Sequence, residues 1–152
     1  MNIAIGCDHG ALDLKNKVKA HLEKRGYQVT DFGAYTAGSC DYPDFARAAA
    51  EAVAAGQCGK GIVLCTTGIG GSITANKVPG IRCALLSDPM SARLTRLHND
   101  TNMMALGAGV VGDNLALEIV DTWLDTEFSG EERHRRRVEK IMAVEAAYSR
   151  QG

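Results

Sequence analysis

The 152-residue sequence lacks the features that mark several classes of protein. No run of about 20 apolar residues is present that could span a bilayer. The formal net charge of −1 gives no electrostatic footprint for nucleic acid or for a membrane surface. The first residues, MNIAIGCDHG, lack a basic region followed by a long apolar segment. We therefore expect no signal peptide and a cytoplasmic location.

Paired cysteines are also missing. The chain has five cysteines, an odd number, and none of them forms a CxxC pair: Cys7, Cys40, Cys58, Cys65 and Cys83. This spacing argues against a structural zinc site or a disulfide framework and favours a reducing cytosol. We expect no metal site.

What the sequence does have is a regular alternation of short apolar runs and longer amphipathic segments. Strands are predicted at 2–6, 27–31, 61–65, 81–86 and 103–106. Helices are predicted at 11–25, 44–55, 73–77, 89–97, 114–124 and 131–148, with Arg93 and Arg96 on the polar side of their helix. Such alternation predicts an α/β fold with one domain over residues 1–152. Its core is a doubly wound, Rossmann-like sheet of five parallel strands with helices on both faces and a long C-terminal helix.

The most informative segment is CTTGIGGSITANK at 65–77, which directly follows the apolar run GIVLC. It brings together a thiol (Cys65), a hydroxyl (Thr67) and backbone N–H groups of several glycines at the start of a helical segment. Such N–H groups bind anions, because they have no intrahelical acceptor and the helix dipole adds positive potential. Helix N-termini also favour thiolates. The segment predicts a nucleophile or base beside an anion-binding loop, although a strand-end cysteine by itself is more often a small buried hydrophobe.

Two further groups of residues lie at or near the edge of the predicted sheet where ligands bind in parallel sheets. Asp8 and His9 follow the first strand, at the edge where the carboxyl ends of the strands meet. Either residue can cap the following helix, or His9 can hold a phosphate while Asp8 holds sugar hydroxyls. His98, Asn99 and Asp100 close the helix at 89–97, where the residues alone favour a structural role.

Two other motifs have competing interpretations. The run RHRRRVEK at 133–140 is typical of a solvated helix face, yet Arg133 and Arg137 are four residues apart and could clamp a phosphate together. Arg135 and Arg136 are expected at the surface. The segment GAGVVG at 107–112 matches GxGxxG, but no second strand with an acidic residue follows about 20 residues later, so we expect no dinucleotide.

In order along the chain, these segments resemble ribose-5-phosphate isomerase B and the galactose-6-phosphate isomerase subunits. The resemblance covers nearly the whole chain and depends on GCDH at 6–9, DYP at 41–43, CTTGIGGSITANK at 65–77, GIR at 80–82, HNDTN at 98–102 and RHRRRV at 133–138. It implies a cofactor-free aldose–ketose isomerase that interconverts ribose 5-phosphate and ribulose 5-phosphate through a cis-enediolate. It also implies a homodimer or tetramer whose site is shared across the subunit interface.

The resemblance further implies roles for single residues. Cys65 resembles the base that moves a proton between C1 and C2, and Thr67 with the glycine amides resembles the anion hole. His98 resembles the group that opens the furanose ring, with Asp8 holding sugar oxygens. The implied substrate-binding and phosphate-binding residues are His9, Tyr42, Thr66, Gly68, Ile69, Gly70, Ser72, Asn99, Arg133 and Arg137.

One position departs from the pattern of the family. Gly109 stands where these isomerases usually carry an arginine, in a segment such as GSRVVG. Losing a charged partner of the phosphate costs about 1.5–3 kcal/mol in binding. Gly109 therefore leaves open an isomerase of a tetrose phosphate or of a hexose phosphate (galactose 6-phosphate, allose 6-phosphate). A separate alternative is a non-catalytic subunit of a heteromeric isomerase. The presence of both Cys65 and His98 argues against the last of these.

Overall fold

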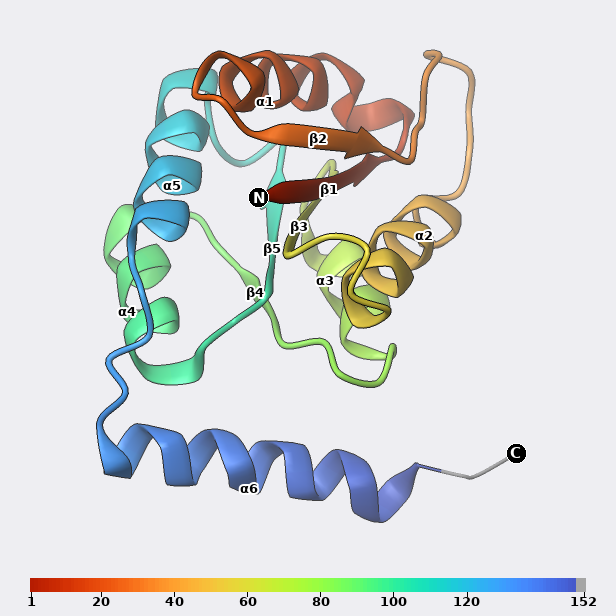
Figure 1. The fold of residues 1–152 in the computed structure, drawn as a ribbon. Coiled ribbons are helices and arrows are strands. Elements are labelled where there is room, and N and C mark those ends of the chain that lie inside the picture. Colours follow the sequence, from red (N-terminus) through yellow and green to blue (C-terminus); the bar gives the residue numbers. More distant parts are fainter. Residues whose placement is uncertain (150–152) are drawn as a thin grey trace.

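The computed structural model describes residues 1–149, which form a five-stranded parallel sheet covered by helices on both faces (Figure 1). The strand order is β2-β1-β3-β5-β4. The strands are β1 (Asn2–Cys7), β2 (Gln28–Asp31), β3 (Lys60–Cys65), β4 (Cys83–Leu85) and β5 (Met103–Gly107). The helices are a 3-10 turn η1 (His9–Ala11), α1 (Leu12–Lys24), α2 (Tyr42–Ala54), α3 (Ile69–Asn76), α4 (Pro89–Asn99), α5 (Asp113–Asp125) and α6 (Glu132–Tyr148). The predicted fold class is confirmed.

Alternate residues of the central strands enter two different cores. Ile62 and Leu64 of β3 belong to the larger core, under α1 and α5, whereas Val63 between them belongs to the smaller core, under α2 and α3. The smaller core is rich in alanine, so α2 approaches the sheet closely: a Cβ added to Gly6 would lie 2.8 Å from the backbone oxygen of Phe45. Burial on both faces explains why the strands are nearly continuous apolar runs.

Two elements differ in length from the prediction. α3 begins at Ile69 instead of 73, because Gly68 adopts a left-handed conformation (φ 77°) that starts the helix directly after the loop. β4 covers only Cys83–Leu85 of the predicted 81–86. The residue before it, Arg82, donates its backbone N–H to the Asn102 side chain rather than to a neighbouring strand.

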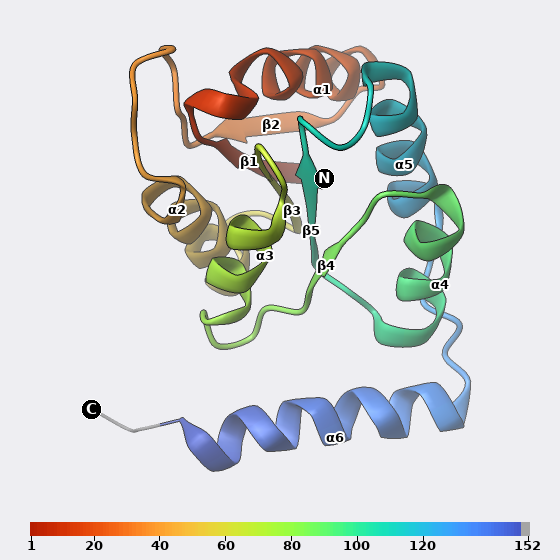
Figure 2. The ribbon, with the colours of Figure 1, turned by 180° about the vertical axis from the view of Figure 1, so that it is seen from behind.

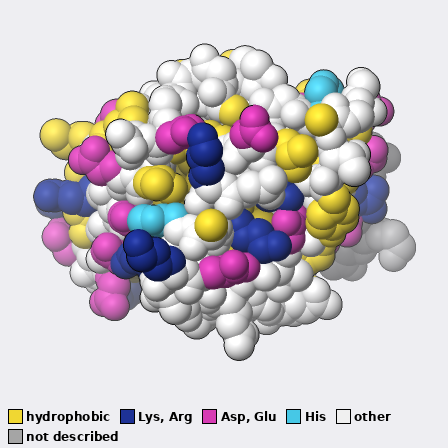
Figure 3. All heavy atoms as spheres, turned by 90° about the horizontal axis from the view of Figure 1, so that it is seen from above, with side chains coloured by type: hydrophobic (Ala, Val, Ile, Leu, Met, Phe, Trp, Pro, Cys, Tyr) yellow, Lys and Arg dark blue, Asp and Glu magenta, His cyan; other side chains and the backbone are white. Residues whose placement is uncertain are grey.

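α6 stands apart from the two helical layers. It lies across one end of the molecule and packs mainly against α4, as the two opposite views show (Figures 1 and 2). On the face shown in Figure 3, acidic and basic side chains are interspersed rather than gathered into a patch of one sign. Within residues 1–149, no helix combines the length and the apolar character needed to cross a bilayer.

Candidate active site

Cys65 is the last residue of β3, one of the three inner strands of the sheet, and it is only 4% exposed. The backbone N–H of Gly68 donates to its Sγ at 3.1 Å. The sulfur lies at a pocket of about 430 Å³, which we call the thiol pocket. The thiol pocket is lined by Asp8, Tyr42, Cys65, Thr66, Thr67, Ile69, Gly70 and Ile73. The predicted meeting of the ends of β1 and β3 is confirmed.

Two glycines of the loop are required by close packing. A Cβ on Gly68 would lie 2.7 Å from Leu85 Cδ1 and 2.8 Å from the backbone carbon of Leu106. A Cβ on Gly70 would lie 2.3 Å from Tyr42 Cζ, so the tyrosine ring covers this glycine. A side chain at Gly68 would meet backbone atoms, and one at Gly70 would displace the Tyr42 ring. The two glycines therefore let the backbone of α3 and the Tyr42 ring approach the thiol.

The backbone N–H groups of the loop are divided between two tasks. Those of Gly68 and Ile69 donate to Cys65 Sγ and to Thr67 Oγ1 (3.2 Å), which holds the loop in place. Gly70 and Gly71 follow in the first turn of α3, where N–H groups have no intrahelical acceptor. These two groups can meet an oxyanion next to the thiol.

One residue of the predicted substrate-binding set turns away from the thiol pocket. Ser72 is buried, and its hydroxyl donates to the carbonyl of Ile69 at 2.8 Å, within its own helix. This bond is the back-bonding that serine makes in helices. In this structure Ser72 therefore stabilises the first turn of α3 and does not line the pocket.

Asp8 and His9 are adjacent in sequence but reach different pockets. Asp8 is 7% exposed, lines the thiol pocket, and accepts the N–H of Gly10 at 3.0 Å, so it also caps η1. His9 lines a neighbouring pocket of about 370 Å³ and accepts the backbone N–H of Cys40 at its Nδ1 (3.2 Å). The predicted cap is therefore made by Asp8, and both residues line pockets in which they could contact a ligand.

The other predicted residues form a second site, which we call the cationic pocket. It has a volume of about 470 Å³ and lies between the end of α4 and the start of α6. The pocket is lined by His98, Asn99, Arg133, His134 and Arg137. The two arginines predicted to share a helix face do so. None of these residues lines the thiol pocket of the same chain.

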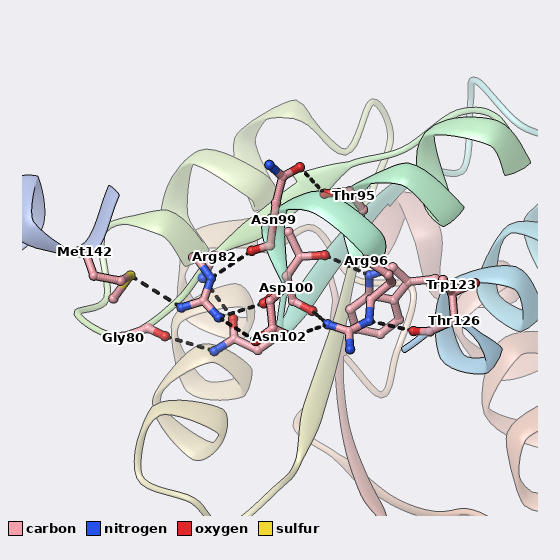
Figure 4. A network of polar contacts seen from close by, with 11 residues as sticks. Gly80, Arg82, Thr95, Arg96, Asn99, Asp100, Asn102, Trp123, Thr126 and Met142 are labelled. Atoms are coloured by element: carbon pink, nitrogen blue, oxygen red, sulfur yellow. Dashed lines mark hydrogen bonds and ion pairs between the residues drawn. The ribbon is translucent and has the colours of Figure 1, made fainter. Parts of the chain in front are cut away.

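A network of hydrogen bonds holds the turn that carries His98 and Asn99 (Figure 4). Arg82 donates from Nε to the carbonyl of Asn99 (3.1 Å) and from Nη2 to the carbonyl of Asp100 (2.6 Å). Its Nη1 also contacts Met142 Sδ of α6 at 3.4 Å. Asp100 has a left-handed backbone (φ 46°), which is strained for a residue with a side chain and is held here by these bonds.

The expectation for Arg96 was wrong. Its side chain is only 6% exposed instead of facing solvent, and its Nη1 donates to Asp100 Oδ1 (2.9 Å) and to the carbonyl of Thr101 (2.7 Å). Trp123 Nε1 donates to Thr101 Oγ1 at 3.0 Å next to it. A buried arginine is stable where its donors are bonded, as they are here.

Cys7 and Cys65 are both buried, but only Cys65 lines the thiol pocket. Cys7 ends β1, is 2% exposed, and lies in the larger core. Burial raises the pKa of the Cys7 thiol to about 11, so this group stays protonated at neutral pH. Cys7 is therefore a packing residue.

The sequence interpretation missed three residues of these sites. His134 lines the cationic pocket from within the RHRRRV segment, where the arginines drew attention. Ile73 lines the thiol pocket. Arg82 belongs to the GIR segment, which supported the family resemblance but was assigned no role in the site. Within residues 1–149, no three His, Cys, Asp or Glu side chains come together as a metal site.

Comparison with known proteins gives a consistent result. The family model described as Ribose/Galactose Isomerase matches residues 3–141. Ribose-5-phosphate isomerase B of Escherichia coli is 50% identical over 143 residues, covering 94% of this chain and 95% of that protein. D-erythrulose-4-phosphate isomerase of Pectobacterium atrosepticum is 47% identical over 131 residues, covering 86% of each.

The fold agrees with these sequence matches. A structure of Clostridium thermocellum ribose-5-phosphate isomerase B superposes with a TM-score of 0.96 at 55% identity, covering 98% of this chain and all of that one. The chain that carries the thiol pocket and the cationic pocket therefore matches such an enzyme over nearly its full length. This chain belongs to the ribose/galactose isomerase family and is an aldose–ketose isomerase.

Proposed function

We propose that this enzyme interconverts ribose 5-phosphate and ribulose 5-phosphate without a cofactor, with Cys65 as the base. The observation that carries the proposal is the thiol pocket, where Cys65 Sγ lies beside the N–H groups at the start of α3. Isomerisation requires a base that takes a proton from the carbon next to the carbonyl and returns it to the neighbouring carbon. The thiolate can do this from one position.

The glycine loop supplies the second requirement of the reaction. Removing the proton yields a cis-enediolate with negative charge on its oxygens. The N–H groups of Gly70 and Gly71, with the Thr67 hydroxyl nearby, are positioned to stabilise that charge. Preorganised donors of this kind contribute about 3–4 kcal/mol each to the transition state. Asp8 lines the same pocket and can accept hydrogen bonds from sugar hydroxyls.

The cationic pocket supplies the remaining steps in this proposal. His98 opens the furanose ring of ribose 5-phosphate by proton transfer, and Asn99 binds a hydroxyl. The Thr95 hydroxyl donates to Asn99 Oδ1 at 3.1 Å, which turns the amide nitrogen of Asn99 away from Thr95 (Figure 4). Arg133 and Arg137 bind the phosphate, since guanidinium groups bind phosphate oxygens bidentately. His9 joins them from the edge of the sheet.

One chain alone does not place these two pockets around one substrate, so we propose a homodimer in which each site uses both subunits. Apolar side chains on α6 support this: Ile141 is 47% exposed, Val144 61% and Tyr148 85%. They border a groove of about 840 Å³ between α6 and the body of the protein. A second copy that covers this groove would bury them, and pairs of such dimers would give the tetramer.

Gly109 supports a second candidate, an isomerase of another sugar phosphate. The N–H of Gly109 donates to the carbonyl of Thr66, so this position borders the loop of the thiol pocket without adding a charge. The relative named for D-erythrulose 4-phosphate is nearly as similar as the one named for ribose 5-phosphate. A tetrose phosphate is therefore the first alternative substrate to test, followed by hexose phosphates.

A substrate panel decides between these candidates. The purified enzyme is assayed for kcat/KM with ribose 5-phosphate, erythrose 4-phosphate, D-erythrulose 4-phosphate, allose 6-phosphate and galactose 6-phosphate. The proposal predicts the highest value for ribose 5-phosphate. A higher value for any other sugar phosphate moves the assignment to that substrate. A chain that is inactive on all of them but still binds them would support the non-catalytic subunit.

A complementation experiment tests the shared site. Variants Cys65→Ala and Arg137→Ala are each inactive or weak, and they are unfolded and refolded together. If each site uses both subunits, a mixed dimer has one intact site, and about a quarter of the wild-type activity returns. If the site lies within one chain, every site keeps a defect and no activity returns. We also propose a cytoplasmic location, in keeping with the five free cysteines of the described chain.

A further inference from the structure

His134 is the one buried residue of α6, and it is a histidine rather than an apolar residue. Its side chain is 6% exposed, while the neighbouring Arg133 and Arg137 are exposed. Burying an imidazole is unfavourable unless its nitrogens are hydrogen-bonded. An apolar side chain would avoid this cost, so the bonds that the imidazole makes indicate what it does.

The hydrogen bonds of His134 define its protonation state. Arg133 Nε lies 3.4 Å from His134 Nε2, and a guanidinium group can only donate, so Nε2 carries no proton. The proton is then on Nδ1, which donates to Ser129 Oγ at 2.8 Å. This tautomer is assigned from the hydrogen-bond partners. The ring is therefore neutral, with one nitrogen fixed by Ser129 and the other facing Arg133.

The charged groups around His134 favour the same state. Burial, His98 on α4, and Arg133 and Arg137 on α6 all lower the pKa of His134 below its ordinary value, and only Glu131 opposes them. A second proton would place a cation beside an arginine and a second imidazole. The neutral form consequently persists through the neutral pH range.

His134 also contacts His98 directly. The two ring centroids lie 4.4 Å apart, with the planes tilted by 36°. The His134 ring is thus an immediate neighbour of the His98 ring, and this contact restricts the orientations that the His98 ring can take. One side chain thus contacts both the proposed ring-opening group and one proposed phosphate ligand, from the wall of the cationic pocket.

We propose that His134 is a positioning residue that, as a neutral imidazole, orients the His98 ring and the Arg133 guanidinium. This inference rests on the proposed function. It divides the task between two parts of one side chain. The ring face packs against His98, and Nε2 accepts a hydrogen bond from Arg133. The two parts can be removed separately.

Two substitutions separate these parts. His134→Phe keeps a flat buried ring against His98 and removes both nitrogens. We expect KM to rise roughly 3- to 10-fold with kcat nearly unchanged, because Arg133 loses an acceptor. His134→Asn keeps a donor for Ser129 and removes the ring face. We expect its kcat to fall with ribose 5-phosphate, which is mainly a closed ring, more than with ribulose 5-phosphate, which cannot form a furanose ring. His21→Phe, on α1, is the matched control.

A purely structural role predicts a different outcome. It would lower the melting temperature or the active fraction of the variants. It would leave KM unchanged, and also the ratio of kcat with ribose 5-phosphate to kcat with ribulose 5-phosphate. That result would overturn the proposal. So would KM and kcat values within twofold of wild type for both variants, once melting curves show that they fold.

An NMR measurement tests the inference without any assay of activity. The chain has only four histidines, and the spectrum of His134→Phe identifies the signals of residue 134. At pH 7 we expect nitrogen shifts of a protonated Nδ1 and a bare Nε2 for His134, and altered shifts of His98 in His134→Asn. The opposite tautomer or a cationic ring would refute the inference. The proposed function fails separately, if wild-type enzyme does not isomerise ribose 5-phosphate.

Discussion

The thiol pocket and the cationic pocket are built from different materials. In the thiol pocket the key groups are a sulfur at the end of β3 and backbone N–H groups at the start of α3, all fixed by the buried sheet. In the cationic pocket they are long side chains on α4 and α6, and α6 contacts mainly α4. In the proposed function, the proton is therefore transferred at the end of a buried strand, whereas the phosphate is bound by a helix at the periphery of the molecule. Four substitutions test this division, in order of decreasing effect.

The largest effect is expected at Cys65. Cys65→Ala removes the proposed base but little volume, so kcat should fall by about 10³-fold or more while the fold remains. The assay is isomerisation in both directions, with circular dichroism to verify folding. Cys58→Ala removes another buried thiol, which does not line the thiol pocket, and this variant should keep full activity. Near-normal kcat in Cys65→Ala would assign the base to another group.

Arg137 should show the opposite kinetic pattern. Arg137→Ala removes a proposed phosphate ligand, so KM should rise by about 10- to 100-fold, with a smaller change in kcat. Arg136→Ala is the control, since Arg136 pairs with Glu132 one turn back on α6. If kcat falls as strongly as for Cys65→Ala while KM stays constant, the proposed division between the two pockets is wrong.

Arg82 connects the two helices that form the cationic pocket. Arg82→Ala removes donors to the carbonyls of Asn99 and Asp100 and should lower the free energy of unfolding by about 2 kcal/mol. KM should rise with it, because the turn at Asp100 is strained. Arg25→Ala, which breaks surface pairs with Asp121 and Asp125, should cost less than about 1 kcal/mol. Urea unfolding measures both variants. Equal losses in the free energy of unfolding would show that the Arg82 network stabilises the protein no more than the surface pairs of Arg25 do.

The smallest effect is expected at Gly109. A Cβ at this position would lie 3.1 Å from the Thr66 carbonyl oxygen, so a side chain needs only a small local shift. If ribose 5-phosphate is the substrate, Gly109→Arg should lower its KM by about 3- to 10-fold by adding a cation for the phosphate. Gly109→Gln has similar bulk without the charge and should not lower it. A fall in kcat/KM for ribose 5-phosphate alone, with gain on a shorter substrate, would favour the tetrose phosphate.

Much of the fold could be predicted because it depends on local patterns. Runs such as GIVLC are apolar throughout because both faces of β3 are buried, and the glycine at position 26 marks the end of α1. The order β2-β1-β3-β5-β4 could not be predicted, since the pairing of strands is a long-range property. The extent of α3 was missed because glycine usually disfavours helices, whereas here Gly70 and Gly71 lie in the first turn of α3 and Gly70 packs closely against the Tyr42 ring.

The candidate site was predicted unevenly for the same reason. Cys65, Thr67 and Gly70 are neighbours in sequence, so one segment indicated one pocket. Arg96 was misjudged because one of its partners, the carbonyl of Thr126, is 30 residues away and is brought close only by the tertiary structure. Its other partners, Asp100 and Thr101, are near in sequence, but the turn that aims them at Arg96 is not encoded in the helical pattern. The role of His134 depends on contacts with another helix and with the loop before α6, which no spacing within RHRRRV encodes.

The strand order has a consequence for how the chain assembles. β4 precedes β5 in sequence, but its only partner in the sheet is β5, which lies between it and β3. During synthesis, β4 cannot join the sheet until residues 103–107 have been made and have paired with β3. Non-local pairing of this kind slows folding and leaves an apolar strand edge uncovered meanwhile. Nascent chains that end before residue 103 should therefore be targets for chaperones, whereas chains released after α5 should close the sheet on their own.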